Sequence, residues 1–466
     1  MDVPAELRAK FEAQRAAYLN NPYPPAKERR EHLGRLLAAL LAHQDELITA
    51  VDKDFGGRSH QETILAELFT AAGAVRFARK HVREWMAKRR SSVPLPMQPA
   101  RAWVMPQPVG VVGIISPWNY PVTLAFTPMA GALAAGNRIL LKPSEYTPAT
   151  SALLARIVAD TFPADHVAVV TGDASTGRAF ASLSFDHLLF TGSTAVGREV
   201  MRAAAENLTP VTLELGGKSP AVIAEDADIR RTAADIVYGK LLNAGQTCIA
   251  PDYVLLPRER MRAFVDACRE AARRYYPRET ASSDYTAVIN ERHADRIRCY
   301  VEEARAGGVE AVPLFSAPAS GRKLPPVLLV DPPDNLAVMR EEIFGPVLPL
   351  KSYDDLESVI AYINARPRPL ALYLFTHKRR VVEEVLKRTV SGGVTVNDTL
   401  MHVGVEDLPF GGTGASGMGQ YHGRAGFDTF SKLKPVFHRR WQGATAPVRP
   451  PTTRFHTLLR KLLIRD

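Results

Sequence analysis

The apolar positions in the first part of the chain recur with the spacing of amphipathic helices. In residues 27–52 the leucine, isoleucine and valine residues follow one another mostly at intervals of three and four, which places them on one helical face. The same spacing runs from Ile64 to Trp85. A basic, proline-containing stretch at 88–96 then interrupts it. These patterns predict helices within 27–52 and 64–85, followed by an irregular segment.

Further along, short apolar runs alternate with longer stretches of helical spacing. The first series of runs comprises Val109–Ile115, Ile139–Leu141, Val167–Val170, His187–Phe190 and Val211–Leu215. The helical stretches between them are Pro128–Ala135, Thr147–Thr161 and Thr194–Ala205. From about Gly216 a second series follows, Ala221–Ile223, Tyr253–Leu256, Val327–Val330, Leu370–Phe375 and Gly393–Val396. Strands alternating with helices predict parallel sheets covered on both faces, here in two α/β units.

Composition and length are those of a globular protein with more than one domain. Of the 466 residues, 46% are hydrophobic and 23% are charged. These values exclude a disordered, collagen-like or disulfide-stapled chain. At this length, two or three structural units are expected.

The net charge of +10 is concentrated at the C-terminal end. Residues 432–466 contain nine Lys or Arg and one acidic residue, a balance of +8, so the rest of the chain sums to +2. Within this tail, residues 455–464 place apolar side chains at helical spacing among basic ones. Such a segment can adsorb weakly to a membrane surface, pack against the protein or a partner subunit, or remain solvated. We expect no nucleic-acid partner.

The cysteines and the N-terminal residues indicate a protein of the reducing cytoplasm. Cys248, Cys268 and Cys299 form an odd set without CxxC spacing, which predicts neither a disulfide framework nor a metal site. The N-terminal residues include acidic side chains and lack the apolar core of a secretory signal. We therefore expect a cytoplasmic protein, with membrane association through the tail left open.

Two segments contain the residue types of covalent catalysis. Cys248 ends the run Asn-Ala-Gly-Gln-Thr-Cys, whose small and polar residues let a ligand approach the backbone. A thiol of lowered pKa is a strong nucleophile, although many lone cysteines are buried apolar residues. Glu214 ends an apolar run and is followed by two glycines and Lys218. It is a candidate general base of raised pKa, or else the ion-pair partner of Lys218.

Two loops after predicted strands carry further polar candidates. In Ser-Pro-Trp-Asn-Tyr-Pro, Asn119 lies between two prolines. Its amide can donate to a developing oxyanion, or it is a structural asparagine in a turn. In Leu-Lys-Pro-Ser-Glu, the candidates are Lys142, Ser144 and Glu145. These side chains can hold ribose hydroxyls, or they cap the helix that follows.

A glycine-containing segment, Phe-Thr-Gly-Ser-Thr-Ala-Val-Gly at 190–197, joins a predicted strand to a predicted helix. In that position Gly192, Ser193 and Gly197 can bring helix N-terminal amides to phosphate oxygens. The glycine spacing is neither the Rossmann fingerprint nor a P-loop. A tight strand–helix turn explains the same residues equally well.

Together these five segments resemble the aldehyde dehydrogenase superfamily. Two further segments fit its pattern, Arg-Glu-Glu-Ile-Phe-Gly-Pro at 340–346 and Leu-Pro-Phe-Gly-Gly-Thr-Gly-Ala-Ser-Gly at 408–417. The resemblance extends from about Asn21 to Pro435. The intervals of 34 and 129 residues that separate the glutamate and the asparagine from the cysteine also agree with it.

Within the superfamily, residues 417–427 resemble the class 3 branch. Residues 54–59 and 396–402 are most similar to bacterial coniferyl aldehyde dehydrogenases. The resemblance therefore implies oxidation of an aldehyde to the acid, with an aromatic aldehyde such as coniferyl aldehyde favoured. A medium- or long-chain aliphatic aldehyde, a catalytically silent structural protein of the same fold and a cysteine hydrolase without cofactor are the alternatives.

The resemblance assigns the chemistry to three residues. Cys248 would attack the aldehyde, and the side chain of Asn119 with the Cys248 backbone N–H would bind the oxyanion of the thiohemiacetal. Hydride transfer to the nicotinamide would leave a thioester. Glu214 would activate the water that hydrolyses it.

The resemblance also implies a nicotinamide dinucleotide. Lys142 and Glu145 would hold the adenosine ribose, and Ser193 with its helix would face the pyrophosphate. Glu342 would bind the nicotinamide ribose, and Phe344 would pack near the ring. The Glu145 carboxylate disfavours a 2′-phosphate, so NAD is expected, with NADP use kept open by the Lys142 cation.

The implied fold has two doubly wound α/β domains and a small bridging region that mediates oligomerisation. The expected dinucleotide-binding domain comprises residues 1–85 and 101–213, and the catalytic domain comprises 214–400. Residues 86–100 and 401–435 would form the bridging region, followed by the basic tail at 436–466. A homodimer, in which bridging strands extend the partner's sheet, is the expected assembly.

Overall fold

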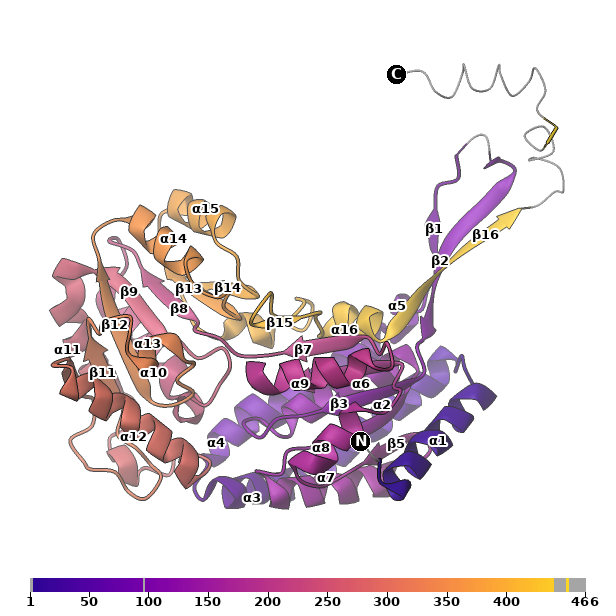
Figure 1. Ribbon diagram of the computed structural model, residues 1–466, viewed down its shortest axis with the longest axis horizontal. Coiled ribbons are helices and arrows are strands. Elements are labelled where there is room, and N and C mark those ends of the chain that lie inside the picture. The colour runs from indigo at the N-terminus through magenta and orange to yellow at the C-terminus, as the bar shows by residue number, and fades with distance from the viewer. Residues whose placement is uncertain (1–2, 95–96, 440–449, 452–466) are drawn as a thin grey trace.

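The computed structural model describes residues 3–94, 97–439 and 450–451. Its strands form a six-stranded, a seven-stranded and a three-stranded sheet. In Figure 1 the two larger sheets form the cores of two lobes, and the three-stranded sheet projects from the first lobe as an arm. The predicted basic amphipathic segment at 455–464 lies outside the described residues.

The first lobe is built on the six-stranded sheet. Its order is β15 (Gly417–Met418), β7 (Val211–Glu214), β6 (His187–Thr191), β3 (Val111–Ile115), β4 (Arg138–Lys142) and β5 (Val167–Val169). All neighbours are parallel except β15, which runs antiparallel to β7. The five strands predicted in the first series are therefore present, with ends that differ by one or two residues.

Both faces of this sheet are buried, which explains its continuous apolar runs. Along β3, Val112 and Ile114 join one core, whereas Val111 and Ile115 join another. The first core includes the helices α2 (Ala26–Ala42), α3 (Gln44–Phe55), α5 (Thr70–Trp85), α6 (Thr123–Ala135) and α7 (Pro148–Thr161). The second includes α1 (Ala5–Asn20), α8 (Ala174–Ala181) and α9 (Thr194–Ala205).

The second lobe is built on the seven-stranded sheet. Its order is β10 (Glu310–Pro313), β11 (Val327–Val330), β12 (Val347–Tyr353), β9 (Tyr253–Pro257), β8 (Pro220–Ile223), β13 (Ala371–Phe375) and β14 (Gly393–Val396). Only the β10–β11 pair among these is antiparallel. The predicted second α/β unit is thus present, with β10 and β12 in addition to the predicted strands.

Helices cover this second sheet on both faces as well. On one side pack α10 (Ile229–Leu241) and α11 (Met261–Tyr275). On the other side pack α14 (Leu356–Asn364) and α15 (Arg379–Arg388). The remaining helices of this lobe are α12 (Glu291–Ala306) and α13 (Ala337–Arg340). The two series of the sequence pattern therefore correspond to two doubly wound lobes.

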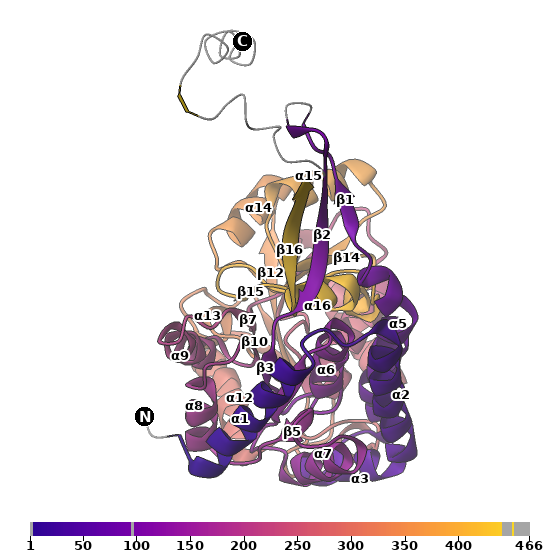
Figure 2. The ribbon, with the colours of Figure 1, turned by 90° about the vertical axis from the view of Figure 1, so that its right-hand side faces the viewer.

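The arm consists of β1 (Arg89–Ser91), β2 (Ala100–Pro108) and β16 (Ser431–Arg439), with β2 in the centre. Figure 1 shows it standing away from both lobes, and in Figure 2 it lies in front of the second lobe. The pairing of β2 with β16 changes two of the predicted domain boundaries. Residues 101–108 belong to the arm and not to the dinucleotide-binding domain, and residues 436–439 continue β16 into the predicted tail. The cause is the pairing of segments more than 300 residues apart, which a local pattern does not reveal.

The predicted bridging region also divides. Its first segment, 86–100, contributes β1 to the arm, whereas of its second segment, 401–435, only the end from Ser431 lies in the arm. Earlier, β15 pairs with β7, and α16 (Gly423–Thr429) packs on α5 and α6 of the first lobe. The other predicted domain limits stay predictions.

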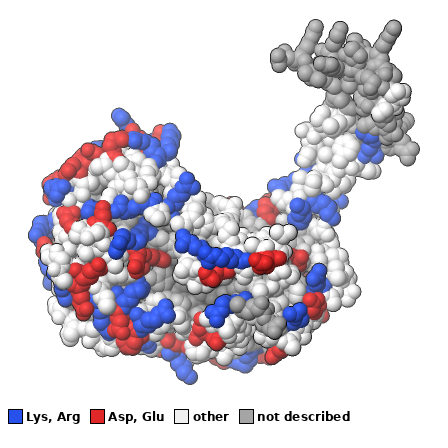
Figure 3. Space-filling view, viewed as in Figure 1, with Lys and Arg blue, Asp and Glu red and all other residues white. Residues whose placement is uncertain are grey.

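Short helical elements lie between the longer helices and strands. They are α4 (His60–Thr63), the π-helix η1 (Ile64–Phe69), and the 3-10 turns η3 (Leu242–Gly245), η4 (Arg258–Arg260), η5 (Glu279–Ala281) and η6 (Met401–Gly404). Among the described residues, no helix is long and apolar enough to cross a membrane. The face drawn in Figure 3 mixes basic and acidic side chains over both lobes, as the small net charge before residue 432 predicts.

Candidate active site

The candidate nucleophile lies in a tight loop between α10 and β9. Residues 243–245 of η3 all have left-handed backbone torsions, with φ of 52° at Asn243, 50° at Ala244 and 77° at Gly245. Such torsions are strained for residues that carry a Cβ. At Gly245 a Cβ would lie 2.4 Å from the carbonyl oxygen of Gly345. The loop therefore needs glycine there, and it delivers Cys248 partly exposed to the interior of a cleft.

Cys248 opens into a cavity of about 250 Å³ between the lobes. Seven of the predicted site residues line it: Asn119, Gly192, Ser193, Glu214, Cys248, Glu342 and Phe344. They come from both series of strands, so the cavity forms where the ends of the two sheets meet. The same cavity includes Trp118, His293 and Arg296, which the sequence did not single out.

A larger groove of about 1090 Å³ adjoins this cavity. It is lined by Lys142, Ser144 and Glu145 at one end, and it shares Gly192 and Ser193 with the cavity of Cys248. All the predicted dinucleotide residues except Gly197 thus lie along one continuous depression. It runs beyond the carboxyl ends of β3, β4 and β6, which is where open α/β sheets bind ligands.

Gly197 has a packing role in this structure. It lines neither depression, and a Cβ there would lie 2.6 Å from Cδ2 of Leu215. The missing side chain allows α9 to approach the end of β7 closely. Ser193 is the N-cap of the same helix, because its Oγ accepts a hydrogen bond of 3.4 Å from the Val196 N–H.

Glu214 ends β7, where its backbone pairs with that of Gly417. The side chain is 2% exposed, and within the described part of the chain neither carboxylate oxygen has a hydrogen-bond partner. Burial therefore raises the pKa of Glu214 well above its ordinary value. The predicted alternative, an ion pair with Lys218, is wrong. Lys218 pairs with Asp252 and also donates to the Val338 and Glu341 carbonyls.

The thiol of Cys248 is protonated in the free protein. Burial raises its pKa, and the Glu342 and Glu214 carboxylates raise it further. The backbone N–H groups of Cys248 and Ile249 oppose the shift only in part. The protein without ligand therefore lacks the lowered pKa that would activate this thiol. The thiolate needs a base beside it or a cation in the cavity.

Asn119 is held through both its side chain and its backbone carbonyl. Its side-chain Nδ2 donates to the carbonyl of Gln246 at 3.1 Å, in the loop of the cysteine. Its own carbonyl accepts from Arg58 Nη1 at 2.8 Å and from Asn243 Nδ2 at 3.0 Å. The residue is 3% exposed and still lines the cavity. Asn119 is thus fixed beside Cys248 with one amide proton committed to Gln246.

Glu342 and Phe344 close the cavity on the side of the second lobe. A Cβ at Gly216 would lie 1.9 Å from Oε2 of Glu342, so only glycine leaves room for this carboxylate. Burial, followed by the nearby Asp252, raises the pKa of Glu342 to about 8. The Phe344 ring meets Trp118 edge-on, with ring centroids 5.3 Å apart.

At the far end of the groove, Lys142 Nζ and Glu145 Oε2 form an ion pair of 3.0 Å. Lys142 is buried, whereas the Glu145 side chain is 36% exposed at the mouth. Ser144 stabilises the turn in which it lies, because its Oγ accepts a hydrogen bond from the Tyr146 N–H at 3.2 Å. The pair thus combines a cation and a carboxylate at one place, as recognition of ribose hydroxyls requires.

The sequence missed two aromatic residues that shape the junction of groove and cavity. Trp118 and His293 lie with ring centroids 5.3 Å apart, and both line the groove and the cavity. Trp118 had a signal, since it precedes Asn119 in the same loop. His293 is in the first turn of α12, which Asn290 caps, and nothing in the local sequence distinguishes it. No cluster of three metal-ligating side chains occurs within the described ranges.

Cys248 and the buried Glu214 thus share one cavity, which continues into a groove at the place where open α/β sheets bind ligands. Comparisons with known proteins identify the class of protein. The model of the aldehyde dehydrogenase family matches residues 4–436. The chain belongs to the aldehyde dehydrogenase family, whose members are NAD(P)-dependent oxidoreductases.

Individual relatives cover nearly all of the chain. It is 51% identical over 461 residues to a probable coniferyl aldehyde dehydrogenase of Pseudomonas aeruginosa, covering 99% of this chain and 97% of the relative. A coniferyl aldehyde dehydrogenase of Pseudomonas sp. is 46% identical, with 92% and 90% covered. A substrate-bound Staphylococcus aureus AldH structure has a TM-score of 0.93 at 34% identity, covering 99% and 100%. The predicted family, fold and enzyme class are confirmed.

Proposed function

We propose that this chain oxidises an aldehyde to the carboxylic acid, with Cys248 as nucleophile and Glu214 as general base. The observation that carries the proposal is one cavity lined by Cys248, Glu214 and Asn119, which continues into the groove of Lys142 and Glu145. The cavity brings the partly exposed Cys248 and the buried Glu214 together. A covalent step followed by hydrolysis needs this arrangement.

The first step forms the carbon–sulfur bond. The thiol of Cys248 lines the cavity and gives its proton to water there, a loss that a positive charge in the cavity favours. The thiolate then attacks the aldehyde carbon, and the carbonyl oxygen becomes an alkoxide. The second amide proton of Asn119 and the backbone N–H of Cys248 are the donors for this oxyanion. They are fixed beforehand, so they stabilise the charge as it develops.

Bound NAD(P) supplies the acceptor for the hydride that leaves the thiohemiacetal carbon. The residues present fit it. Glu342 presents an oxygen, Oε1, that has no partner within the described part of the chain, and this oxygen can accept from a ribose hydroxyl. Phe344 and Trp118 provide aromatic walls for a flat ring. Ser193 places the N-terminus of α9 at the groove, where its amides attract pyrophosphate.

The last step hydrolyses the thioester. Glu214 takes a proton from a water molecule as the oxygen attacks the acyl carbon. The carbon–sulfur bond breaks, the acid leaves and the thiolate of Cys248 regains a proton. Among the residues that the structure describes, neither Glu214 oxygen has a hydrogen-bond partner, which suits this role because the carboxylate is free to accept from water.

For the substrate we propose an aromatic aldehyde such as coniferyl aldehyde, and for the cofactor NAD in preference to NADP. The relatives at 46–51% identity that bear the coniferyl name support the first choice. The Glu145 carboxylate at the groove mouth supports the second, since it repels a 2′-phosphate.

The arm supports a homodimer as the assembly. Both of its outer strands, β1 and β16, and the outer strand β14 of the second lobe are sheet edges in the described chain. Exposed edges pair readily with another chain, and Phe437 on β16 is 49% exposed. Light scattering of the purified protein tests for a dimer.

The appearance of reduced cofactor at 340 nm tests the main proposal. Wild-type protein with NAD and coniferyl aldehyde is expected to produce NADH, and Cys248→Ala is expected to produce none. Comparing kcat/KM for coniferyl aldehyde, benzaldehyde and decanal then ranks the substrate classes. If none of these aldehydes gave NADH, the proposal would be wrong.

A further inference from the structure

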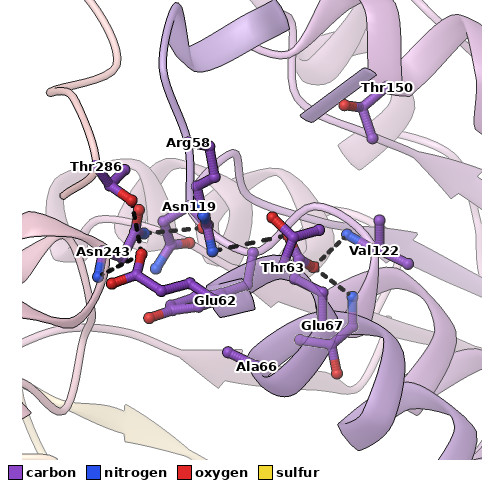
Figure 4. A network of polar contacts seen from close by, with 12 residues as sticks. Arg58, Glu62, Thr63, Ala66, Glu67, Asn119, Val122, Thr150, Asn243 and Thr286 are labelled. Atoms are coloured by element: carbon purple, nitrogen blue, oxygen red, sulfur yellow. Dashed lines mark hydrogen bonds and ion pairs between the residues drawn. The ribbon is translucent and has the colours of Figure 1, made fainter. Parts of the chain in front are cut away.

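A buried arginine, Arg58, lies behind the active site and contacts the loop of Asn119. The helix α3 ends at Phe55, and Gly56 and Gly57 follow with φ of 66° and 129°. These torsions turn the chain back toward the protein interior, and Asp52 Oδ1 fixes the turn by accepting from the Arg58 N–H at 2.7 Å. As a result the Arg58 side chain is fully buried. Figure 4 shows it between the first helices and Asn119.

The guanidinium makes two kinds of contact with the Asn119 loop. Its Nη1 donates to the Asn119 carbonyl at 2.8 Å. Its carbon lies 4.9 Å from the ring centre of Tyr120 and 4.7 Å from that of Phe55, so the cation is stacked between two aromatic faces. The Tyr120 hydroxyl in turn lies 2.7 Å from Oγ1 of Thr247, the residue before Cys248.

Glu67 holds the other end of the same loop. Its Oε2 accepts from the backbone N–H groups of Val122 at 2.8 Å and Thr123 at 2.9 Å. These N–H groups lie at the start of α6, where a helix offers its own amides no acceptor, and a carboxylate stabilises a helix N-terminus. The second oxygen, Oε1, is 4.0 Å from Nη2 of Arg58. Glu67 therefore caps α6 with a charge that Arg58 balances.

Glu62 extends the network to the loop of the cysteine. Its Oε2 accepts from the Asn243 N–H at 3.2 Å and from Thr286 Oγ1 at 2.6 Å. Asn243 has a left-handed backbone, and its side chain donates to the same Asn119 carbonyl that accepts from Arg58. Both loops of the active site are thus tied to one short segment, residues 58–67, as Figure 4 shows.

The two buried carboxyl groups, Glu62 and Glu67, depend on the positive charge of Arg58. Burial raises the pKa of Glu62 and of Glu67 to about 7, and in both cases Arg58 is the largest opposing influence. Without a cation, two carboxylates in this interior would take up protons or admit water, because a buried unpaired charge is strongly unfavourable. A protonated Glu67 is also a weaker cap for α6.

We propose that Arg58 is a positioning residue for the oxyanion donor: it fixes the backbone of Asn119 and supports Glu67 and Glu62, the carboxyl groups that anchor the two active-site loops. This inference rests on the proposed function. It predicts that loss of Arg58 slows the step in which the oxyanion forms, while the dinucleotide groove, which Arg58 does not line, keeps its affinity.

The test compares Arg58→Met with Arg29→Met. Arg29 is a matched control, since it is equally buried and binds the Ala134 and Ala135 carbonyls at the opposite end of α6. Rapid mixing with NAD and aldehyde gives the rate of the first NADH turnover, and fluorescence titration gives the NAD dissociation constant. We expect Arg58→Met to slow the first turnover about 10- to 100-fold, since loss of one oxyanion donor costs about 100- to 1,000-fold.

Further measurements distinguish a positioning role of Arg58 from a purely stabilising one. NAD affinity should change less than about twofold in Arg58→Met, and Arg29→Met should lower the melting temperature with a first turnover within about twofold of wild type. Arg58→Lys keeps the charge without the fork of donors, so its rate should lie between those of wild type and Arg58→Met. It also decides the question if Arg58→Met does not fold.

Three results would overturn the inference. They are a wild-type rate in Arg58→Met, a wild-type rate in Arg58→Lys, and an equal loss of rate in Arg29→Met. An inactive wild-type protein would instead remove the proposed function. The two failures are therefore distinguishable in one experiment.

Discussion

The side-chain amide of Asn119 donates a 3.1 Å hydrogen bond to the carbonyl of Gln246, across 127 residues of sequence. This bond joins the loop after β3 in the first lobe to the loop before β9 in the second. Together with the contacts of Asn243 with Asn119 and of Tyr120 with Thr247, it fixes the oxyanion donor beside the loop of the nucleophile. Substitutions in either loop are therefore expected to lower the rate of aldehyde oxidation more than they lower the affinity for the cofactor.

Glu214→Gln is expected to separate the two halves of the reaction. The glutamine keeps the shape of the side chain but cannot take a proton from water, so thioester hydrolysis should slow by about 100-fold or more. Rapid mixing should still show a first burst of NADH, followed by a slow steady rate. If the burst is lost as well, Glu214 acts in a step before hydride transfer, and its assignment to hydrolysis alone is wrong.

Alkylation of Cys248 by iodoacetamide should accelerate with pH in the free protein. Burial and two carboxylates raise the thiol pKa, so the thiolate fraction should rise about tenfold per pH unit between pH 7 and 9. A Cys299→Ser background removes the exposed thiol, and Cys268 is buried. A rate that levels off below pH 8 would contradict the raised pKa.

Glu145→Gln should shift the cofactor preference toward NADP. The substitution removes the carboxylate that repels a 2′-phosphate and leaves the Lys142 cation without its ion pair. We expect the KM for NADP to fall about tenfold, with a smaller rise in the KM for NAD. Lys142→Met is the converse control and should lose NADP use. Equal effects of Glu145→Gln on both cofactors would place the ribose elsewhere.

Thermal stability should fall between pH 6.5 and 8. Burial raises the pKa of Glu62, Glu67 and Glu406 to about 7, and that of Glu342 to about 8. A raised carboxyl pKa stabilises the fold fully below 4.5, the unfolded value, and this contribution is lost as pH rises through the folded value.

The buried histidines act in the opposite direction at lower pH. Their pKa values are lowered from 6.5, to about 4 for His187, His402 and His422 and to about 3 for His166. Their contribution is complete above 6.5 and is lost as pH falls through those lowered values. Above 6.5 the carboxyl groups therefore decide the trend.

Scanning calorimetry at pH 6.5 and 8 checks this expectation. The melting temperature should fall by a few degrees in wild-type protein and by less in Glu406→Gln, which cannot ionise at that position. A melting temperature that is constant or higher at pH 8 would contradict the raised carboxyl pKa values.

The strands of both lobes could be predicted because they are buried on two faces and read as continuous apolar runs. The arm could not be, since β2 contains Pro106 and Pro108 and pairs with residues 431–439. Helix α6 likewise starts at Thr123 and not at the predicted Pro128, because Glu67 from another segment caps its first amides. Contacts between distant segments decide such ends.

The same distinction holds in the site. Cys248, Glu214 and Asn119 stand in short motifs whose residue types already indicate the chemistry, and the structure brings them to one cavity. Arg58 and His293 contact Asn119 and Trp118, residues distant from them in sequence, so no local pattern marks them. The pKa of Cys248 could not be predicted either, because it depends on burial and on carboxylates that the fold brings close.

The most direct test of the central claim is mass spectrometry of Glu214→Gln protein, quenched in acid after mixing with NAD and an excess of aldehyde. The account predicts an added mass equal to the aldehyde less two hydrogen atoms, on the peptide that contains Cys248 and only when NAD is present. NADH formation without such an adduct, or with the adduct on Cys268 or Cys299, would contradict it.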